Sequence, residues 1–184
     1  MNILLKKRRD NMFEKGEYVV YGNTGVCKIE DITTLDMKGV SESRLYYILI
    51  PRHQKESKIF TPVDSEKTVM RAVLTKAEAD ALINAIPDIE ELWVGDDKQR
   101  EEKYKETIRS GECRDWIRVI KTLYVRKQRR IAQGKKTTVM DEKYLRMAED
   151  NLYSELSVSL AIPKEQMQEY ITDRILEMDV QESN

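Results

Sequence analysis

Histidine and cysteine are scarce in this sequence, and their scarcity excludes much of the familiar chemistry of enzymes and metal sites. The chain of 184 residues holds one His and two Cys. The histidine, His53, lies in a polar stretch where a general base would have no placed partner. The cysteines, Cys27 and Cys113, lie 86 positions apart, which leaves neither a disulfide framework nor a Cys-rich zinc site. Isolated, reduced cysteines are typical of a cytoplasmic protein.

Long apolar runs are missing as well. No window approaches roughly 18 uninterrupted apolar residues, so no membrane-spanning helix is expected. Residues 1–11 place their apolar residues before their basic ones, which is the reverse of a secretory signal. We expect this segment to be a disordered extension outside the fold.

The common catalytic and nucleotide-binding motifs are also absent. The sequence contains no GxSxG, HExxH, CxxC or GxxxxGK[ST]. The stretch Gly22–Gly25, GNTG, lacks the lysine and the following helix that a phosphate loop requires. Asn and Gly tolerate the positive φ of a tight turn, so a hairpin between two strands is the better interpretation. The sequence therefore predicts no catalytic residues, no cofactor and no metal site.

Charge is abundant but unevenly distributed. Lys, Arg, Asp and Glu make up 35% of the chain, and the net charge is −1. The segment 97–136 holds fourteen Lys/Arg and six Asp/Glu, so it carries about +8 and the remainder about −9. A local positive field of this size attracts polyanions such as nucleic acid. A solvated helical face has a similar composition, so charge alone leaves both interpretations open.

The first part of the chain has the pattern of strands. Alternating apolar and polar residues, together with β-branched and aromatic residues, predict five short strands. They cover residues 17–21, 26–33, 45–50, 57–63 and 68–73. Short connections between them predict antiparallel pairing in a small closed barrel or a strongly bent sheet.

From Thr75 the apolar period becomes helical. Thr75 and Glu78 form a capping box that begins a helix, and Pro87 ends it. Apolar spacing predicts four further helices, over residues 96–110, from about 116 to 133, 140–160 and 167–178. Their short connections predict a compact bundle. The predicted fold is therefore α+β, with a β domain over residues 12–74 and a helical domain over residues 75–184.

The two tryptophans differ in their surroundings. Trp116 is in step with Ile120 and Leu123 on an apolar stripe, which predicts a core residue. Trp93 precedes the charged helix, where it could plug the interface between the domains. It could also insert into the minor groove of DNA, as apolar wedges of architectural proteins do. Large aromatics are usually buried, which favours the plug.

Four stretches together point to a known family. They are Lys15–Ile32 (KGEYVVYGNTGVCKIEDI), Ile59–Val63, the break at Arg109–Glu112 and the helix from Asp141 to Leu156. In this order and spacing, over residues 12 to about 160, they resemble the CarD/CdnL family of bacterial transcription regulators. Residues 12–73 are also similar to a module of the transcription-repair coupling factor.

The resemblance implies a Tudor-like or SH3-like β-barrel that docks on the β subunit of RNA polymerase. It also implies a helical domain that touches promoter double-stranded DNA at the upstream edge of the bubble, largely without sequence specificity. Such proteins are not enzymes; they shift the equilibrium between closed and open complexes through their differential affinity. The candidate polymerase contacts are Ile32, Thr34, Leu35, Ile59 and Phe60. The candidate DNA contacts are Trp93, Lys98, Arg100, Lys103, Arg129 and Arg130.

The sequence departs from the family pattern at two points. Relatives often carry a wedge tryptophan at a place that falls at about Asp97 here, four residues after Trp93. Polymerase-contacting arginines of some relatives fall at Leu35 and Phe60. We expect a cytoplasmic, nucleoid-associated monomer. A protein-protein adaptor whose basic helices only confer solubility, or an RNA-binding translation factor, stay open as alternatives.

Overall fold

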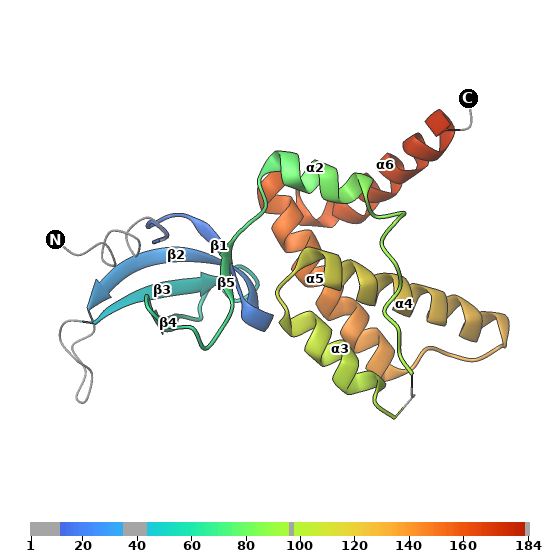
Figure 1. Ribbon diagram of the computed structural model, residues 1–184, viewed down its shortest axis with the longest axis horizontal. Helices are drawn as coiled ribbons and strands as arrows, with labels where there is room; N and C mark the ends of the chain where they lie inside the picture. The colour runs from blue at the N-terminus through green and yellow to red at the C-terminus, as the bar shows by residue number, and fades with distance from the viewer. Residues whose placement is uncertain (1–11, 35–43, 96–97, 183–184) are drawn as a thin grey trace. The chain divides into compact units, whose positions relative to one another are not determined.

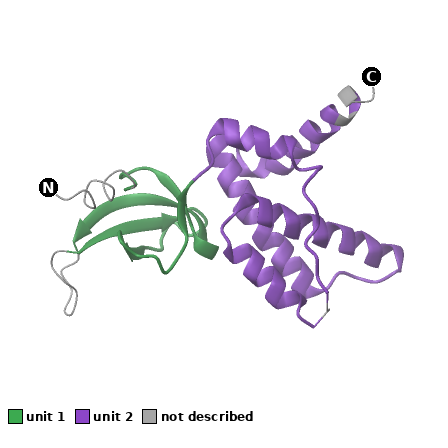
Figure 2. Cartoon of the chain, viewed as in Figure 1, with its two compact units in different colours: residues 1–72 green, residues 73–184 purple. Residues whose placement is uncertain are grey.

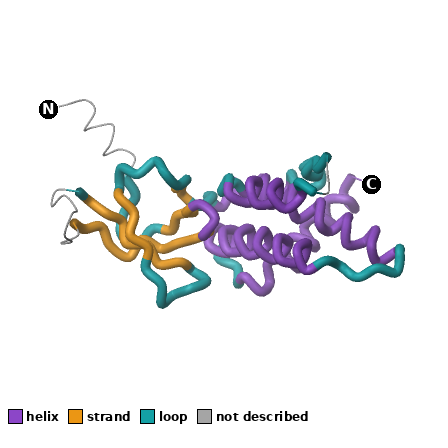
Figure 3. Tube along the Cα trace, turned by 90° about the horizontal axis from the view of Figure 1, so that it is seen from below, coloured by secondary structure: helices purple, strands orange, loops and turns teal. Residues whose placement is uncertain are grey.

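The computed structural model describes residues 12–34, 44–95 and 98–182 and divides the chain into two compact units. Residues 1–72 form the β unit and residues 73–184 the helical unit (Figures 1 and 2). Strands and helices are thus segregated along the chain, as Figure 3 shows by colour. This arrangement confirms the predicted α+β class.

The β unit contains one antiparallel sheet with the strand order β4-β3-β2-β1-β5. Its strands are β1 (Tyr18–Tyr21), β2 (Gly25–Thr34), β3 (Leu45–Pro51), β4 (Ile59–Pro62) and β5 (Met70–Ala72). All five lie within two residues of their predicted bounds. The sheet is open in the described part of the chain, because the short strands β4 and β5 each pair on one side only. The expectation of a closed barrel is therefore not met.

The GNTG stretch turns the chain between β1 and β2. Residues Gly22–Thr24 form a single 3-10 turn (η1), and the register closes with Tyr21 opposite Gly25. Gly22 has φ 46° and Gly25 has φ 79°, values that favour glycine. A Cβ on Gly22 would lie 2.7 Å from Cγ2 of Thr68. The hairpin interpretation is confirmed, and the glycines provide backbone geometry and close approach.

Alternating residues of β1, β2 and β3 form the core of this unit. Val19, Cys27, Ile29, Tyr47 and Leu49 are buried together. Burial raises the pKa of the Cys27 thiol to about 12, because the apolar surroundings disfavour the thiolate. Cys27 is therefore an inert core residue, since reactivity requires the thiolate.

The helical unit contains five α-helices and one short 3-10 turn in its described residues. They are α2 (Lys76–Asn84), α3 (Arg100–Arg109), α4 (Cys113–Ala132), α5 (Val139–Leu160), η2 (Lys164–Gln166) and α6 (Met167–Glu182). The capping box is confirmed: Glu78 N donates to Thr75 Oγ1, and Thr75 N donates to Glu78 Oε2. Helix α3 begins four residues later than predicted, because Lys98 and Gln99 form a turn.

Helices α3, α4 and α5 pack against one another around buried aromatics. Trp116 is fully buried, and its Nε1 donates to the carbonyl oxygen of Ile108 at 3.1 Å. This hydrogen bond joins α4 to the end of α3 and confirms Trp116 as a core residue. Tyr104 and Tyr144 contact each other beneath the same helices, with ring centroids 5.9 Å apart. None of the helices in the described ranges is long and apolar enough to cross a membrane.

Candidate nucleic-acid and protein interfaces

Arg100 lies inside the helical unit, although the sequence predicted a DNA contact. Its Nε is 3.6 Å from Asp141 Oδ1, and Arg126 Nε donates to Asp141 Oδ2 at 3.0 Å. Only 9% of Arg100 is exposed. Asp141 thus links α3, α4 and α5 from the first turn of α5. The prediction for Arg100 is wrong because the carboxylate binds its guanidinium within the unit.

Trp93 is 80% exposed, so the helical unit does not bury it. The chain between α2 and α3 crosses α4 (Figure 1), and Leu92 packs inward with its N donating to Thr122 Oγ1 at 2.7 Å. Neighbouring side chains of an extended segment face opposite sides. Because Leu92 takes the inward position, Trp93 points outward. The helical unit by itself therefore does not bury Trp93, and the choice between a wedge and a plug between the domains stays a prediction.

The same segment is anchored by a lysine of α4. Lys121 Nζ donates to the carbonyl oxygens of Ile86 at 3.1 Å, of Pro87 at 3.0 Å and of Ile89. Gly95 leaves room for the exposed indole, since a Cβ there would lie 2.5 Å from a ring carbon of Trp93. The segment therefore holds Trp93 at the surface on a fixed backbone.

The lysines of α3 lie among acidic residues. Lys103 Nζ pairs with Glu106 at 3.1 Å, and Lys105 Nζ pairs with Glu102 at 3.6 Å. Lys98 is exposed in the turn before the helix. Exposed pairs of this kind contribute little stability but lower the local positive potential. The predicted contacts Lys98 and Lys103 are thus on the surface, in a region of mixed charge.

A positive patch lies at the end of α4. No acidic residue occurs between residues 116 and 140, and the cations of this run gather where the helix ends. Arg130 Nε donates to the carbonyl oxygen of Lys136 at 2.8 Å, which folds the following loop back onto the helix. Gly134, with φ 70°, allows that turn. We call this patch the basic end of α4; it comprises Lys127, Arg129, Arg130, Lys135 and Lys136.

Sequence reasoning found Arg129 and Arg130 but missed the other three cations of the basic end. The sequence contains the information that would have identified them, because the run without acidic residues continues from α4 through the loop that follows it. A hollow of about 440 Å³ beside Arg129 and Arg130 is lined on its other side by Leu92 and Val94. The neighbours of Trp93 in the chain therefore border the basic end. A protruding indole and a cationic surface occur together, as in proteins that insert wedges into DNA.

The predicted polymerase contacts divide between core and surface. Ile32 and Ile59 are partly buried and pack against the core of the β unit, and their role as polymerase contacts stays a prediction. Strand alternation explains their position, because both residues share the inward face with Tyr47 and Leu49. Thr34 is exposed at the end of β2, and Leu35 lies outside the described residues.

Phe60 is exposed on the edge strand β4, and the sequence-based prediction did not include its neighbours on the same face. It lies opposite Ile48, and Pro62 lies opposite Tyr46, so these four side chains share the outer face of the sheet. Half of Phe60 is exposed. We call these residues the Phe60 patch. The period of two along β3 would have predicted Tyr46 and Ile48 on this face.

The described residues include no group of three His, Cys, Asp or Glu side chains that could hold a metal ion. His53 is exposed in the loop after β3. The two surfaces that stand out are instead interaction surfaces, an apolar strand edge and a cationic helix end with an exposed indole.

Comparison with known proteins gives two family matches in tandem. Residues 13–74 match the CarD-like/TRCF RID domain, and residues 88–172 match the C-terminal domain of CarD. No curated protein matches the chain. The CarD family is a family of non-enzymatic transcription factors, and the CarD-like/TRCF RID domain implies interaction with RNA polymerase. Because the two domains occur in family order over most of its length, the chain belongs to the CarD/CdnL family.

Proposed function

We propose that the protein is a monomeric, nucleoid-associated regulator that bridges the β subunit of RNA polymerase and promoter DNA. The β unit, as a Tudor-like domain over residues 12–74, docks on the polymerase. The helical domain, residues 75–184, contacts the duplex at the upstream edge of the bubble. The observation that carries the DNA half is the exposed Trp93 beside the basic end of α4.

The DNA contact follows from charge and shape. Lys and Arg bind phosphates without reading sequence, which suits a factor that acts at many promoters. The hollow beside Trp93 on its α3 side has a lining of mixed charge, with Glu102, Lys103 and Glu106. The hollow on the α4 side has a net positive lining, which attracts phosphates; its charged residues are Glu91, Arg100, Arg126, Arg129 and Arg130. We therefore infer that the duplex lies toward α4, with the indole inserted at a base step and the phosphates on the basic end.

The polymerase contact follows from the free edge of the sheet. Among the strands of the described residues, β4 pairs with β3 alone, so its outer backbone groups can accept a further strand. Pro62 fits an edge position because it has no N–H to donate. The Phe60 patch supplies apolar area next to that edge, in place of the arginine contacts of some relatives.

The regulatory effect is a shift in population. A protein bound to the polymerase and to DNA next to the bubble populates the open complex only through its higher affinity for that state. A preference of about 1.4 kcal/mol changes the ratio of open to closed complexes about tenfold. Contacts of one indole and several cations with DNA can provide a difference in binding free energy of this order.

The proposal is tested by site-specific crosslinking on a polymerase-promoter complex. A photoreactive phenylalanine analogue at Phe60 is expected to crosslink the β subunit, and the same analogue at Trp93 to crosslink promoter DNA upstream of the bubble. Crosslinks from position 93 to RNA or to protein alone would instead support the translation-factor or adaptor interpretation.

Trp93→Ala is expected to shorten the half-life of the open complex about five- to tenfold while leaving the melting temperature nearly unchanged. The indole is 80% exposed, so its removal costs the fold less than about 0.5 kcal/mol. Open-complex decay after a competitor challenge, together with thermal unfolding, checks both parts. Leu176→Ala, at an exposed residue of α6, is the control. A large loss of melting temperature with an unchanged half-life would support the plug.

Phe60→Ala is expected to weaken binding to the isolated β lobe of the polymerase about 10- to 30-fold, or about 1.4–2 kcal/mol. The side chain is the exposed centre of the Phe60 patch, so truncation removes contact area without opening the core. Biolayer interferometry with the full chain measures the change. Val69→Ala, an exposed residue next to the opposite edge strand, serves as the matched control. Equal affinities for the two variants would place the docking surface elsewhere.

A further inference from the structure

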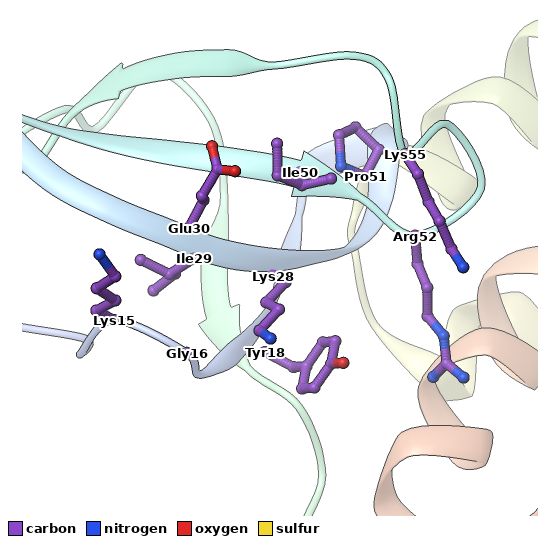
Figure 4. A pocket seen from close by; sticks show the side chains of 10 residues that line it. All are labelled: Lys15, Gly16, Tyr18, Lys28, Ile29, Glu30, Ile50, Pro51, Arg52 and Lys55. Atoms are coloured by element: carbon purple, nitrogen blue, oxygen red, sulfur yellow. The ribbon is translucent and has the colours of Figure 1, made fainter.

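The outer face of the β unit carries a second feature, a hollow of about 370 Å³ that the proposed polymerase contact does not use. Tyr18, Ile50 and Pro51 form much of its apolar lining. Its charged lining consists of Lys15, Lys28, Glu30, Arg52 and Lys55 (Figure 4). The combination of apolar wall and cationic rim is distinct from the Phe60 patch.

Strand register explains why these residues meet. Lys28 lies opposite Tyr18 on β1 and opposite Ile50 on β3, which forms one row across the sheet. Figure 4 shows Tyr18 and Lys28 side by side, with Arg52 extending from the loop after β3. Gly16 N donates to the carbonyl oxygen of Ile29 at 2.8 Å. This hydrogen bond holds the chain before β1 against β2, where it forms one side of the hollow.

The charges around the hollow are unbalanced. Its one acidic residue, Glu30, pairs with Lys58 at 2.7 Å, and Lys15 pairs with Asp31 at 3.2 Å. Among the described residues, neither Lys28 nor Lys55 makes an ion pair. Two flexible ammonium groups therefore border an apolar wall, each available to an anionic partner.

The size and lining of the hollow indicate the partner. An opening of about 370 Å³ accommodates one large side chain with neighbouring backbone, and its wall is mainly apolar, with the cations at the rim. We propose that this hollow is a second docking site, for an acidic protein segment that inserts an aromatic or large aliphatic side chain. The wall takes that side chain, and Lys28 and Lys55 bind its acidic neighbours.

The hollow is continuous with the surface next to β4. Ile50 and Ile48 lie two residues apart on β3, so they point to the same face of the sheet. A segment bound in the hollow can thus extend toward the Phe60 patch. The second site does not depend on which protein that patch binds.

Amide chemical shifts of the ¹⁵N-labelled full chain test the proposal, with the capped pentapeptide Glu-Glu-Tyr-Glu-Glu as the probe. We expect shifts at Gly16, Lys28 and Ile50, with at least about fivefold tighter binding than capped pentaglutamate. Residue-resolved shifts separate this site from the basic end of α4. The double variant Lys28→Glu/Lys55→Glu is expected to weaken binding at least about tenfold at these amides.

Three results would overturn the second docking site. The first is an absence of shifts at the three amides. The second is an equal loss of binding in the charge-matched control Lys67→Glu/Lys76→Glu, whose residues lie outside the hollow. The third is a duplex oligonucleotide that shifts the same amides at lower concentration than the peptide, which would identify the hollow as a nucleic-acid contact.

Discussion

A fourfold variant of the basic end is expected to bind duplex DNA at least about 100-fold more weakly at about 100 mM salt. Its substitutions are Arg129→Gln, Arg130→Gln, Lys135→Gln and Lys136→Gln. All four belong to the basic end of α4, in a run without acidic residues between residues 116 and 140; Glu142 of α5 is the acid that lines the same hollow as Lys135 and Lys136. Each phosphate contact also contributes nearly one unit to the salt slope. Fluorescence anisotropy at several salt concentrations is expected to show a slope smaller by about three to four.

The matched control uses lysines in a different electrostatic setting. Lys103→Gln/Lys105→Gln removes two cations of α3 that pair with Glu106 and Glu102. We expect this pair to lower DNA affinity less than about threefold, and Lys135→Gln/Lys136→Gln alone to lower it about tenfold or more. Equal effects of the two pairs would show that total charge, rather than the basic end, determines binding. An unchanged salt slope in the fourfold variant would exclude this surface as the DNA contact.

The location of the positive surface could be predicted only in part, because composition does not show which cations are used inside the fold. Segment 97–136 has a surplus of about +8, yet Arg100 and Arg126 bind Asp141, and Lys121 binds backbone carbonyl oxygens. Asp141 lies in another helix, beyond any local pattern. The cations that remain on the surface are concentrated in the run of residues 116–140, which contains no acidic residue, and that run is visible in the sequence.

Local sequence patterns predicted the strands, the turn and the helix cap, but they did not predict whether the sheet closes. The strand pattern, the GNTG turn and the capping box at Thr75 depend on neighbouring residues, and all three are confirmed. Whether the sheet closes into a barrel depends on pairing between β4 and β5, which lie at opposite edges of the sheet. The residue pattern within each strand does not indicate whether these two edges pair. The directions of the Ile59 and Trp93 side chains follow from alternation along an extended chain, a local rule that was not applied to them.

Glu155→Ala is expected to destabilise the helical unit by about 3–4 kcal/mol and to lower its melting temperature by roughly 10–15 °C. Glu155 is completely buried in α5. Leu74 N donates to its Oε1 at 2.9 Å, and Cys113 Sγ donates to its Oε2 at 3.0 Å. Alanine leaves both donors without this acceptor and opens a cavity among packed helices. Chemical denaturation followed by circular dichroism measures the loss.

Glu155→Gln separates the hydrogen bond from the packing. The amide keeps the shape of the side chain and one acceptor oxygen, so we expect less than half of the loss seen with alanine. Because Leu74 lies at the start of the helical unit, directly after Val73, losing its acceptor is expected to increase hydrogen exchange at that amide most in Glu155→Ala and less in Glu155→Gln. Wild-type stability of Glu155→Gln together with unchanged exchange at Leu74 in Glu155→Ala would show that Glu155 acts through packing alone, whereas equal destabilisation by both substitutions would show that the carboxylate itself is required. The graded result would establish that a buried carboxylate fixes the point at which the chain enters the helical unit.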